Sequence, residues 1–220
     1  MSDYRETRYC ESLDGILDRK STFMVAFRKE HPRVKDIHRY VYPNDSRYKS
    51  EFIEIYKGKC AYCGASIKFI PKEMFEIDHF LPKEMVRFVT KADAGKIENL
   101  VLACHTCNHN KSSFEVPDEL YSNLHPDHDG IKNAFFRDDM FYIRLSTGQP
   151  VAVARFYEQL RLGRETVRLD YLLTCMYGLC ERTKDKEELN AMLEKAIRLL
   201  QAKRNLGVTS ALLSGETERD

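Results

Sequence analysis

Apolar residues recur at steps of three and four positions in four stretches of the chain, a spacing that places side chains on one face of an α-helix. The dipeptide His31-Pro32 should end the first helix, because proline disfavours helical geometry in the residue before it. The two stretches near the C-terminus predict longer amphipathic helices. The four predicted helices cover residues 12–30, 45–57, 165–182 and 186–204.

The middle of the chain lacks this helical pattern, and glycines, prolines and cysteines divide it into short segments. We predict one strand over Met74–Asp78, a second over Leu100–Ala103, and a helix from about Cys107 to Phe114. Residues 115–150 are rich in Gly and Pro and should be mostly loop, with a short strand at Phe141–Leu145.

Four regions follow from these patterns. They are an N-terminal helical region, a central module of short strands, a loop-rich segment that ends in the C-terminal helices, and a flexible tail. Their expected bounds are 1–57, 58–115, 116–205 and 206–220.

The composition is that of a globular protein, since 43% of the 220 residues are hydrophobic and 31% are charged. No apolar run is long enough for a transmembrane helix, and the charged N-terminus lacks the apolar core of a secretory signal. We therefore expect a cytoplasmic protein with no membrane partner. The net charge is only +1, but residues 57–111 carry nine Lys and Arg against six Asp and Glu. This small excess favours a central module that faces phosphates.

Four of the seven cysteines form two CxxC pairs forty residues apart, Cys60 with Cys63 and Cys104 with Cys107. Two such pairs supply the four thiolates of a tetrahedral structural zinc site, whereas a redox-active protein needs one pair in a thioredoxin-like context. We expect one structural zinc on these four residues. His105 lies between ligands and should be exposed. The remaining thiols have no ligand spacing, and Cys175 and Cys180 fit a helical core.

The residues between and after the zinc pairs read CxxC, then DHxxP, then NLVLxCxxCNxxK. Taken together over residues 60–111, this pattern resembles the HNH endonuclease family. The resemblance implies an α+β protein with a ββα-metal core that is stapled by the four-cysteine zinc site and extended by N- and C-terminal helices. It also implies one catalytic divalent cation, Mg²⁺ or Mn²⁺, held against a DNA phosphate.

Carried over by position, the resemblance assigns His79, Asn99 and Asn108 to the three motif positions and Asp78 to the carboxylate ligand before the first histidine. The sequence departs from the common pattern at the third position, where Asn108 stands in place of histidine. Related nucleases use asparagine there, and His109 is an alternative ligand one residue further on.

The chemistry of phosphodiester hydrolysis suits these residue types. His79 can accept a proton from water at neutral pH, and Asp78 and the Asn108 carbonyl are hard oxygen ligands for the cation. Asn99 should orient the His79 imidazole, and Lys111 should contact a phosphate. Adjacent strand residues face opposite sides, so Asp78 and His79 can share a site only if the strand ends and turns there.

The sequence is also compatible with other functions. The substrate could be RNA, or the zinc module could bind nucleic acid or a protein without catalysis. The helical flanks look similar to nuclease subunits of bacterial anti-phage systems, including PtuB-like proteins that work with an ATPase partner. The segment LHPDHDG at 124–130 could bind a metal through Asp127 and Asp129, but a solvated acidic loop is the favoured interpretation.

Overall fold

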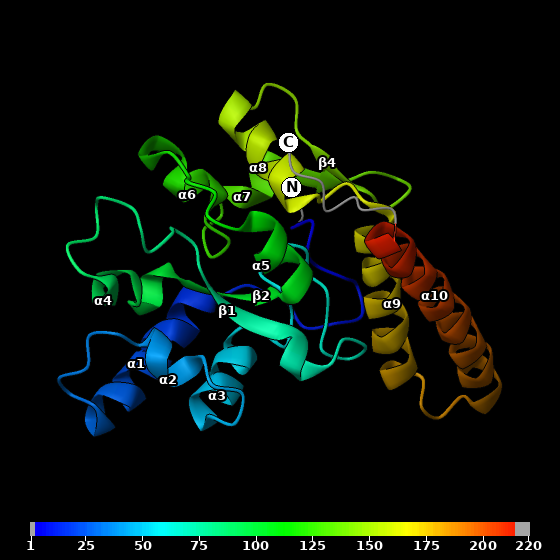
Figure 1. The fold of residues 1–220 in the computed structure, drawn as a ribbon. Coiled ribbons are helices and arrows are strands. Elements are labelled where there is room, and N and C mark those ends of the chain that lie inside the picture. The colour runs from blue at the N-terminus through cyan, green and yellow to red at the C-terminus, as the bar shows by residue number, and fades with distance from the viewer. Residues whose placement is uncertain (1–2, 214–220) are drawn as a thin grey trace.

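The computed structural model describes residues 3–213. Helices surround a small central β-hairpin, as Figure 1 shows. In chain order the elements are α1 (Ile16–Glu30), α2 (His38–Val41), α3 (Arg47–Ile55), η1 (Lys72–Met74), β1 (Phe75–His79), α4 (Lys91–Ala94), η2 (Ile97–Asn99), β2 (Leu100–Cys104), α5 (His105–Lys111), η3 (Asp118–Leu120), α6 (Tyr121–Leu124), α7 (Ile131–Ala134), β3 (Phe135–Arg137), β4 (Ile143–Leu145), α8 (Val151–Leu160), α9 (Glu165–Arg182) and α10 (Glu187–Leu213). None of the helices between residues 3 and 213 is both long and apolar enough to cross a membrane.

The centre of the protein is an antiparallel β1–β2 hairpin with α5 packed beside it. The pairing register runs from Phe75 opposite Cys104 to His79 opposite Leu100. Every residue of β2 is buried, because the strand lies inside the core with neighbours on both faces. The predicted ββα unit is confirmed, although α5 begins two residues earlier and ends three residues earlier than the sequence predicts.

The N-terminal helices form one wall of the core. Helices α1 and α3, which were predicted from their apolar spacing, pack against each other. Their contact is largely aromatic, because the rings of Phe23 and Phe27 on α1 both pack against that of Tyr48 on α3. Phe23 also contacts Phe52. Phe27 and Phe52 are almost fully buried, so this wall is part of the same core as the hairpin.

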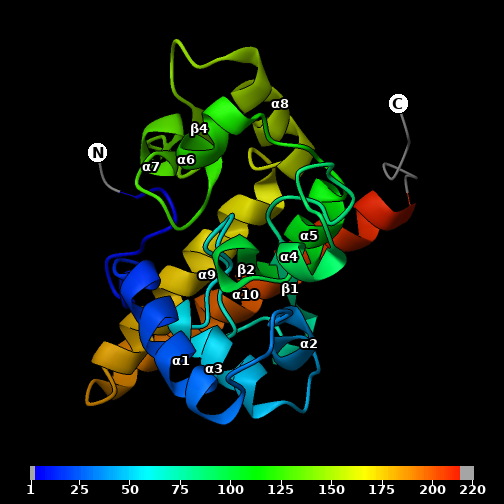
Figure 2. The same ribbon diagram turned by 90° about the vertical axis from the view of Figure 1, so that its left-hand side faces the viewer.

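Helices α9 and α10 form a hairpin on the side of the molecule opposite α4 (Figures 1 and 2). The bounds of α9 match the prediction, but α10 continues to Leu213. Residues 206–213, which we expected to belong to a flexible tail, are therefore helical, and 214–220 lie outside the described residues. Cys175 and Cys180 are half-buried on α9 rather than core thiols.

The segment that we predicted as mostly loop contains more structure than expected. Strands β3 and β4 form a second antiparallel hairpin, of which only β4 was predicted. Helix α8 was not predicted, although Val153, Phe156 and Leu160 stand at helical spacing and are all buried. The helix lies between Pro150 and a left-handed Arg161, directly after the Gly- and Pro-rich segment whose composition predicts loop.

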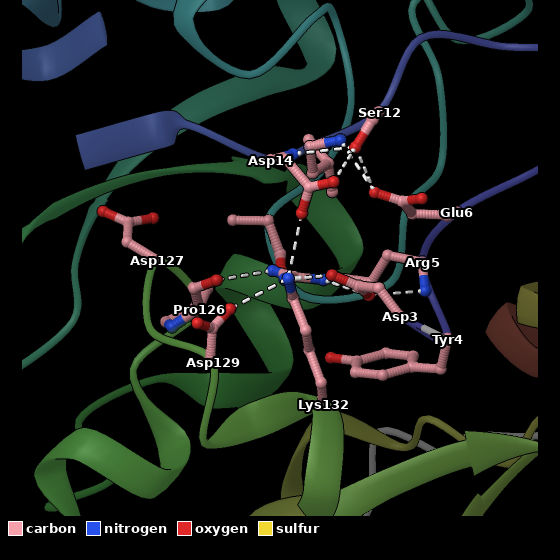
Figure 3. A network of polar contacts seen from close by, with 12 residues as sticks. Asp3, Tyr4, Arg5, Glu6, Ser12, Asp14, Pro126, Asp127, Asp129 and Lys132 are labelled. Atoms are coloured by element: carbon pink, nitrogen blue, oxygen red, sulfur yellow. Dashed lines mark hydrogen bonds and ion pairs between the residues drawn. The ribbon is translucent and has the colours of Figure 1, made fainter. Parts of the chain in front are cut away.

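The N-terminal segment, residues 3–13, is a series of turns that connects distant parts of the chain. The buried guanidinium of Arg5 donates one hydrogen bond to the carbonyl of Ala61 in the first CxxC turn and one to that of Pro126, both at 2.7 Å. Asp3 neutralises it through an ion pair of 2.7 Å. Figure 3 shows this cluster, with Lys132 bridging Asp14 and Asp129 at its edge. The first CxxC turn is thus held from outside by the N-terminal segment.

The side chains of His125 and Asp127 in the loop 124–130 are buried, whereas Asp129 is exposed, so the expectation of a solvated acidic loop is corrected at Asp127. The carboxylate of Asp127 pairs with the Lys20 ammonium at 2.5 Å and accepts a hydrogen bond from the Tyr56 hydroxyl at 2.7 Å. Burial alone would raise the pKa of Asp127, but the Lys20 charge holds it below its usual value. The same ammonium donates to the carbonyls of Ile97 and Leu100, so this ion pair joins α1 to the start of β2.

Breaking this ion pair should be costly. Asp127→Asn leaves the Lys20 charge buried without its counter-ion, so we expect the free energy of unfolding to fall by about 3–5 kcal/mol. Urea unfolding with zinc present measures this. The control is Glu11→Gln, which breaks a 3.6 Å ion pair with Lys57 at the surface and should cost less than about 1 kcal/mol. Equal losses in the two variants would contradict the assigned role of Asp127.

Candidate active site and zinc clamp

The four predicted zinc ligands meet at one point. The sulfur atoms of Cys60, Cys63, Cys104 and Cys107 all lie within 4.8 Å of one another, and all four residues are buried. The Cys63 and Cys104 sulfurs are 3.9 Å apart. A tetrahedron with zinc–sulfur bonds of about 2.3 Å has edges of about 3.8 Å, so the spacing fits a zinc ion and not a disulfide. The residues present can hold the predicted structural zinc.

Backbone geometry explains how the first pair reaches the second. The Ala61 N–H donates to the carbonyl of Leu102 on β2 at 2.7 Å, which fixes the CxxC turn to the strand that leads into Cys104. Gly64, directly after the second ligand of this pair, has a φ of +79°, which glycine adopts without steric cost. A Cβ atom there would also lie 2.6 Å from the backbone oxygen of Arg5, so the close approach of the N-terminal segment requires glycine.

One face of β1 turns two carboxylates toward α5. Glu76 is half-buried, and its carboxylate accepts hydrogen bonds from the Asn108 amide and, at 2.8 Å, from the His105 ring. Asp78 is buried, and its carboxylate accepts a hydrogen bond of 2.5 Å from the Tyr62 hydroxyl. Because the two residues are two positions apart on a strand, both lie along the same helix.

Lys111 occupies a different place from the one expected. We predicted a contact with a nucleic-acid phosphate, but Lys111 is only 1% exposed. Its ammonium lies 3.1 Å from Asp78 and donates to the backbone carbonyl of His79 at 2.9 Å. Burial raises the pKa of Asp78, and the Lys111 charge limits that rise. In this arrangement Lys111 favours the charged form of the carboxylate and fixes the end of β1.

His79 leaves β1 on the other side. The strand continues through His79 instead of ending at Asp78, so the two adjacent side chains face different neighbours. The imidazole is 8% exposed and packs on the ring of His38, with 4.2 Å between ring centroids. Burial lowers the pKa of His79 to about 3, helped by His38 and by the nearby charges of Lys83 and Lys111. The ring is therefore neutral at physiological pH and can accept a proton.

Asn99 holds the chain beyond the histidine rather than the histidine ring. Its side-chain oxygen accepts from the Leu81 N–H at 2.8 Å, and its amide donates to the carbonyls of Leu81 and Ala94. Its own carbonyl accepts from the Phe80 N–H at 2.8 Å. The expected contact between Asn99 and the imidazole is absent within residues 3–213. Asn99 instead fixes the turn that follows His79.

Asn108 and His109 are adjacent on α5, but their side chains point in different directions. Asn108 is half-buried and faces β1, where it meets Glu76. His109 is exposed and stacks on the ring of His105, with centroids 5.9 Å apart. Their different directions follow from the rotation of about 100° per helical residue. Asn108, and not His109, points toward the carboxylates.

The donor set on this face suits a hard divalent cation. Glu76, Asp78 and Asn108 offer carboxylate and amide oxygens, which magnesium and manganese prefer. A carboxylate has about four acceptor positions, and Tyr62 and Lys111 occupy up to three of those on Asp78. At least one position therefore remains for a cation.

Sequence reasoning missed three residues of this region. Glu76 could have been found, because a residue two positions before Asp78 lies on the same strand face. Tyr62 lies between two zinc ligands, and nothing local indicates that its hydroxyl would reach Asp78. His38 is 41 positions before His79, and only the folded chain brings α2 beside β1 (Figure 2).

Among the comparisons with known proteins, a family model agrees with this geometry over the central module. A search of curated proteins and a search of solved structures each found no match to the chain. The family model of the HNH endonuclease matches residues 60–114, which span both CxxC pairs, β1, β2 and α5. This segment of the chain is an HNH endonuclease domain.

Proposed function

We propose that the protein is an endonuclease that hydrolyses DNA phosphodiester bonds and depends on a divalent cation. The observation that carries the proposal is the HNH domain itself, in which a neutral His79 ends the strand that carries Asp78, with Asn108 across from it on α5. A module that only binds has no need for a proton acceptor beside a carboxylate ligand. This favours catalysis over the non-catalytic alternative.

In the proposed reaction His79 is the general base. Its neutral imidazole accepts the proton of the attacking water, and the negative charge of a bound phosphate raises the pKa of the ring toward a more effective value. Asp78 and His79 face different sides of β1. A phosphate that lies near both the cation on Asp78 and the His79 base must therefore lie across the end of the strand. Asn99 and Lys111 hold that end of the strand in place.

Asp78 and Asn108 would hold the catalytic cation, with Glu76 as a further oxygen donor beside Asn108. When bound, such a cation neutralises charge on the phosphate and on the leaving oxygen. The Lys111 ammonium, 3.1 Å from Asp78, favours the deprotonated form that a metal ligand requires.

We also propose a protein partner, and the resemblance of the helical flanks to anti-phage nuclease subunits favours an ATPase in a defence system. One feature of α10 supports a partner. Its exposed apolar side chains include Leu189, Met192, Leu199 and Leu206, with steps of three, seven and seven residues. This spacing forms a stripe along one face of a helix, which suits packing against another apolar helix.

The substrate class can be tested directly. Purified protein is incubated with supercoiled plasmid, single-stranded DNA or RNA, each with Mg²⁺ or Mn²⁺. We expect cleavage of DNA with either cation. Cleavage of RNA alone would replace the DNA proposal with the RNA alternative. Binding of nucleic acid without cleavage under every condition would support the non-catalytic module.

Variants of Asn108 and His109 test which of these two residues holds the catalytic cation. Asn108→Ala should lower the cleavage rate strongly, on the order of 10²-fold, because it removes an oxygen donor that faces the carboxylates. Asn108→His should keep part of the activity and shift the cation preference toward softer ions. His109→Ala should be mild, because that ring is exposed. Cleavage rates at saturating cation decide the ranking, and the reverse order would contradict the assignment.

A further inference from the structure

We propose that His38 is a positioning residue for the general base, holding the His79 imidazole in the orientation that accepts a proton. The proposal rests on the nuclease function proposed above. It would make the N-terminal helical region part of the active site, although that region lies outside the HNH match.

The backbone of His79 is fixed from several directions. His79 pairs with Leu100 across the hairpin, and the His79 carbonyl accepts a hydrogen bond from the Lys111 ammonium at 2.9 Å. Asn99 binds Phe80 and Leu81, the next two residues along the chain. These contacts set the position of the His79 Cα atom, but none of them sets the torsion angles of its side chain.

The side chain has a different kind of neighbour. Within residues 3–213 no side chain or backbone group forms a hydrogen bond with the His79 imidazole. The only ring in that part of the chain that stacks on it is His38, at 4.2 Å and an interplanar angle of 44°. A ring covering one face of an imidazole limits its rotation. The orientation of the base therefore depends on His38.

His38 is itself held firmly against β1. Its Nε2 atom lies 3.3 Å from the carbonyl of Ile77, so that nitrogen carries the hydrogen and donates it. The backbone N–H groups of Ile37 and His38 both donate to the carbonyl of Gly95, at 2.8 and 3.3 Å. Ile37 and Val41 are buried on either side. In Figures 1 and 2 α2 lies beside β1.

The contacts of His38 with the His79 ring and with the Ile77 carbonyl can be separated by substitution. His38→Phe keeps a ring against His79 and loses the hydrogen bond to Ile77. His38→Gln keeps a donor for Ile77 and loses the ring. His38→Ala loses both. A matched control is His31→Ala, because His31 is also a half-buried histidine of this region, with a ring contact of 4.8 Å to Phe27 and a hydrogen bond to Tyr48.

Cleavage kinetics on a short DNA duplex provide the first readout. We expect His38→Ala and His38→Gln to lower kcat by about 10- to 100-fold with KM nearly unchanged, because a misplaced catalytic group loses rate and not binding. His38→Phe should restore most of kcat. The control His31→Ala should lower the melting temperature as much as His38→Ala but leave kcat intact. A wild-type kcat in His38→Ala, or equal losses in His38→Phe and His38→Gln, would overturn the proposal.

NMR spectra of histidine-labelled protein provide a second readout that needs no activity. The His79 ring resonances should shift or broaden in His38→Ala and stay in place in His31→Ala. If wild-type protein cleaves nothing, the nuclease proposal fails and the spectra still test the contact. If wild type cleaves but neither kcat nor the His79 resonances respond to His38→Ala, only the positioning role is wrong.

Discussion

Replacement of Cys107 by serine should release the zinc and unfold the central module. The four sulfurs are buried within 4.8 Å of one another, and they join the turn before β1 to the end of β2 and the first turn of α5. Structural zinc contributes folding free energy directly, on the order of 10 kcal/mol in small zinc-finger peptides, which is comparable to the whole stability of a domain. Cys60→Ser should behave in the same way.

Elemental analysis and thermal unfolding together measure this effect. Wild-type protein purified without chelator should contain about one zinc per chain and unfold cooperatively. Cys180→Ser is the control, because Cys180 is a half-buried thiol on α9 outside the cluster, and it should keep both zinc and fold. Wild-type protein without zinc, or Cys107→Ser with normal stability, would show that the cluster is not a metal clamp.

Replacement of His79 by alanine should abolish measurable cleavage while nucleic-acid binding remains. The variant removes the proposed proton acceptor, whose loss typically lowers the rate by about 10²–10⁴-fold. Binding should remain because the backbone carbonyl of His79, and not its ring, forms the hydrogen bond with Lys111. The fold around the strand end should therefore survive the substitution.

Single-turnover cleavage and equilibrium binding, measured on one DNA duplex, test both halves of this expectation. His109→Ala removes an exposed histidine from the same domain and should match wild type in both measurements. Cleavage by His79→Ala at the wild-type rate would assign the base elsewhere, whereas loss of binding together with cleavage would indicate a structural role for the ring.

The sequence was most informative where a function depends on local spacing. Two CxxC pairs predicted which cysteines meet, and the residues between them predicted the hairpin and the helix that carry His79 and Asn108. Each of these motifs is recognised from near neighbours along the chain, and the resemblance to the HNH family joined the motifs that lie about forty residues apart. The match of residues 60–114 to the HNH family and the sulfur cluster support them.

The contacts that set the chemistry within that frame are mostly long-range. Lys111 points inward to Asp78 because α5 packs along β1. The local sequence alone predicts an exposed charge on a helix at this position. Asp127 and Lys20 are 107 positions apart, so the acidic loop gave no sign that its charge would be buried. The alternation of strand residues did predict that Asp78 and His79 diverge unless the strand ends, and β1 continues through His79.

The most direct test of the central claim is the dependence of DNA cleavage on an added cation when the zinc is retained. Wild-type protein is dialysed free of magnesium and manganese, its zinc content is measured, and supercoiled plasmid is added. The account predicts intact plasmid at this stage and nicked or linear DNA after Mg²⁺ or Mn²⁺ is restored, with His79→Ala inactive throughout. Plasmid that stays supercoiled with either cation, in protein that holds its zinc and binds the DNA, would contradict it.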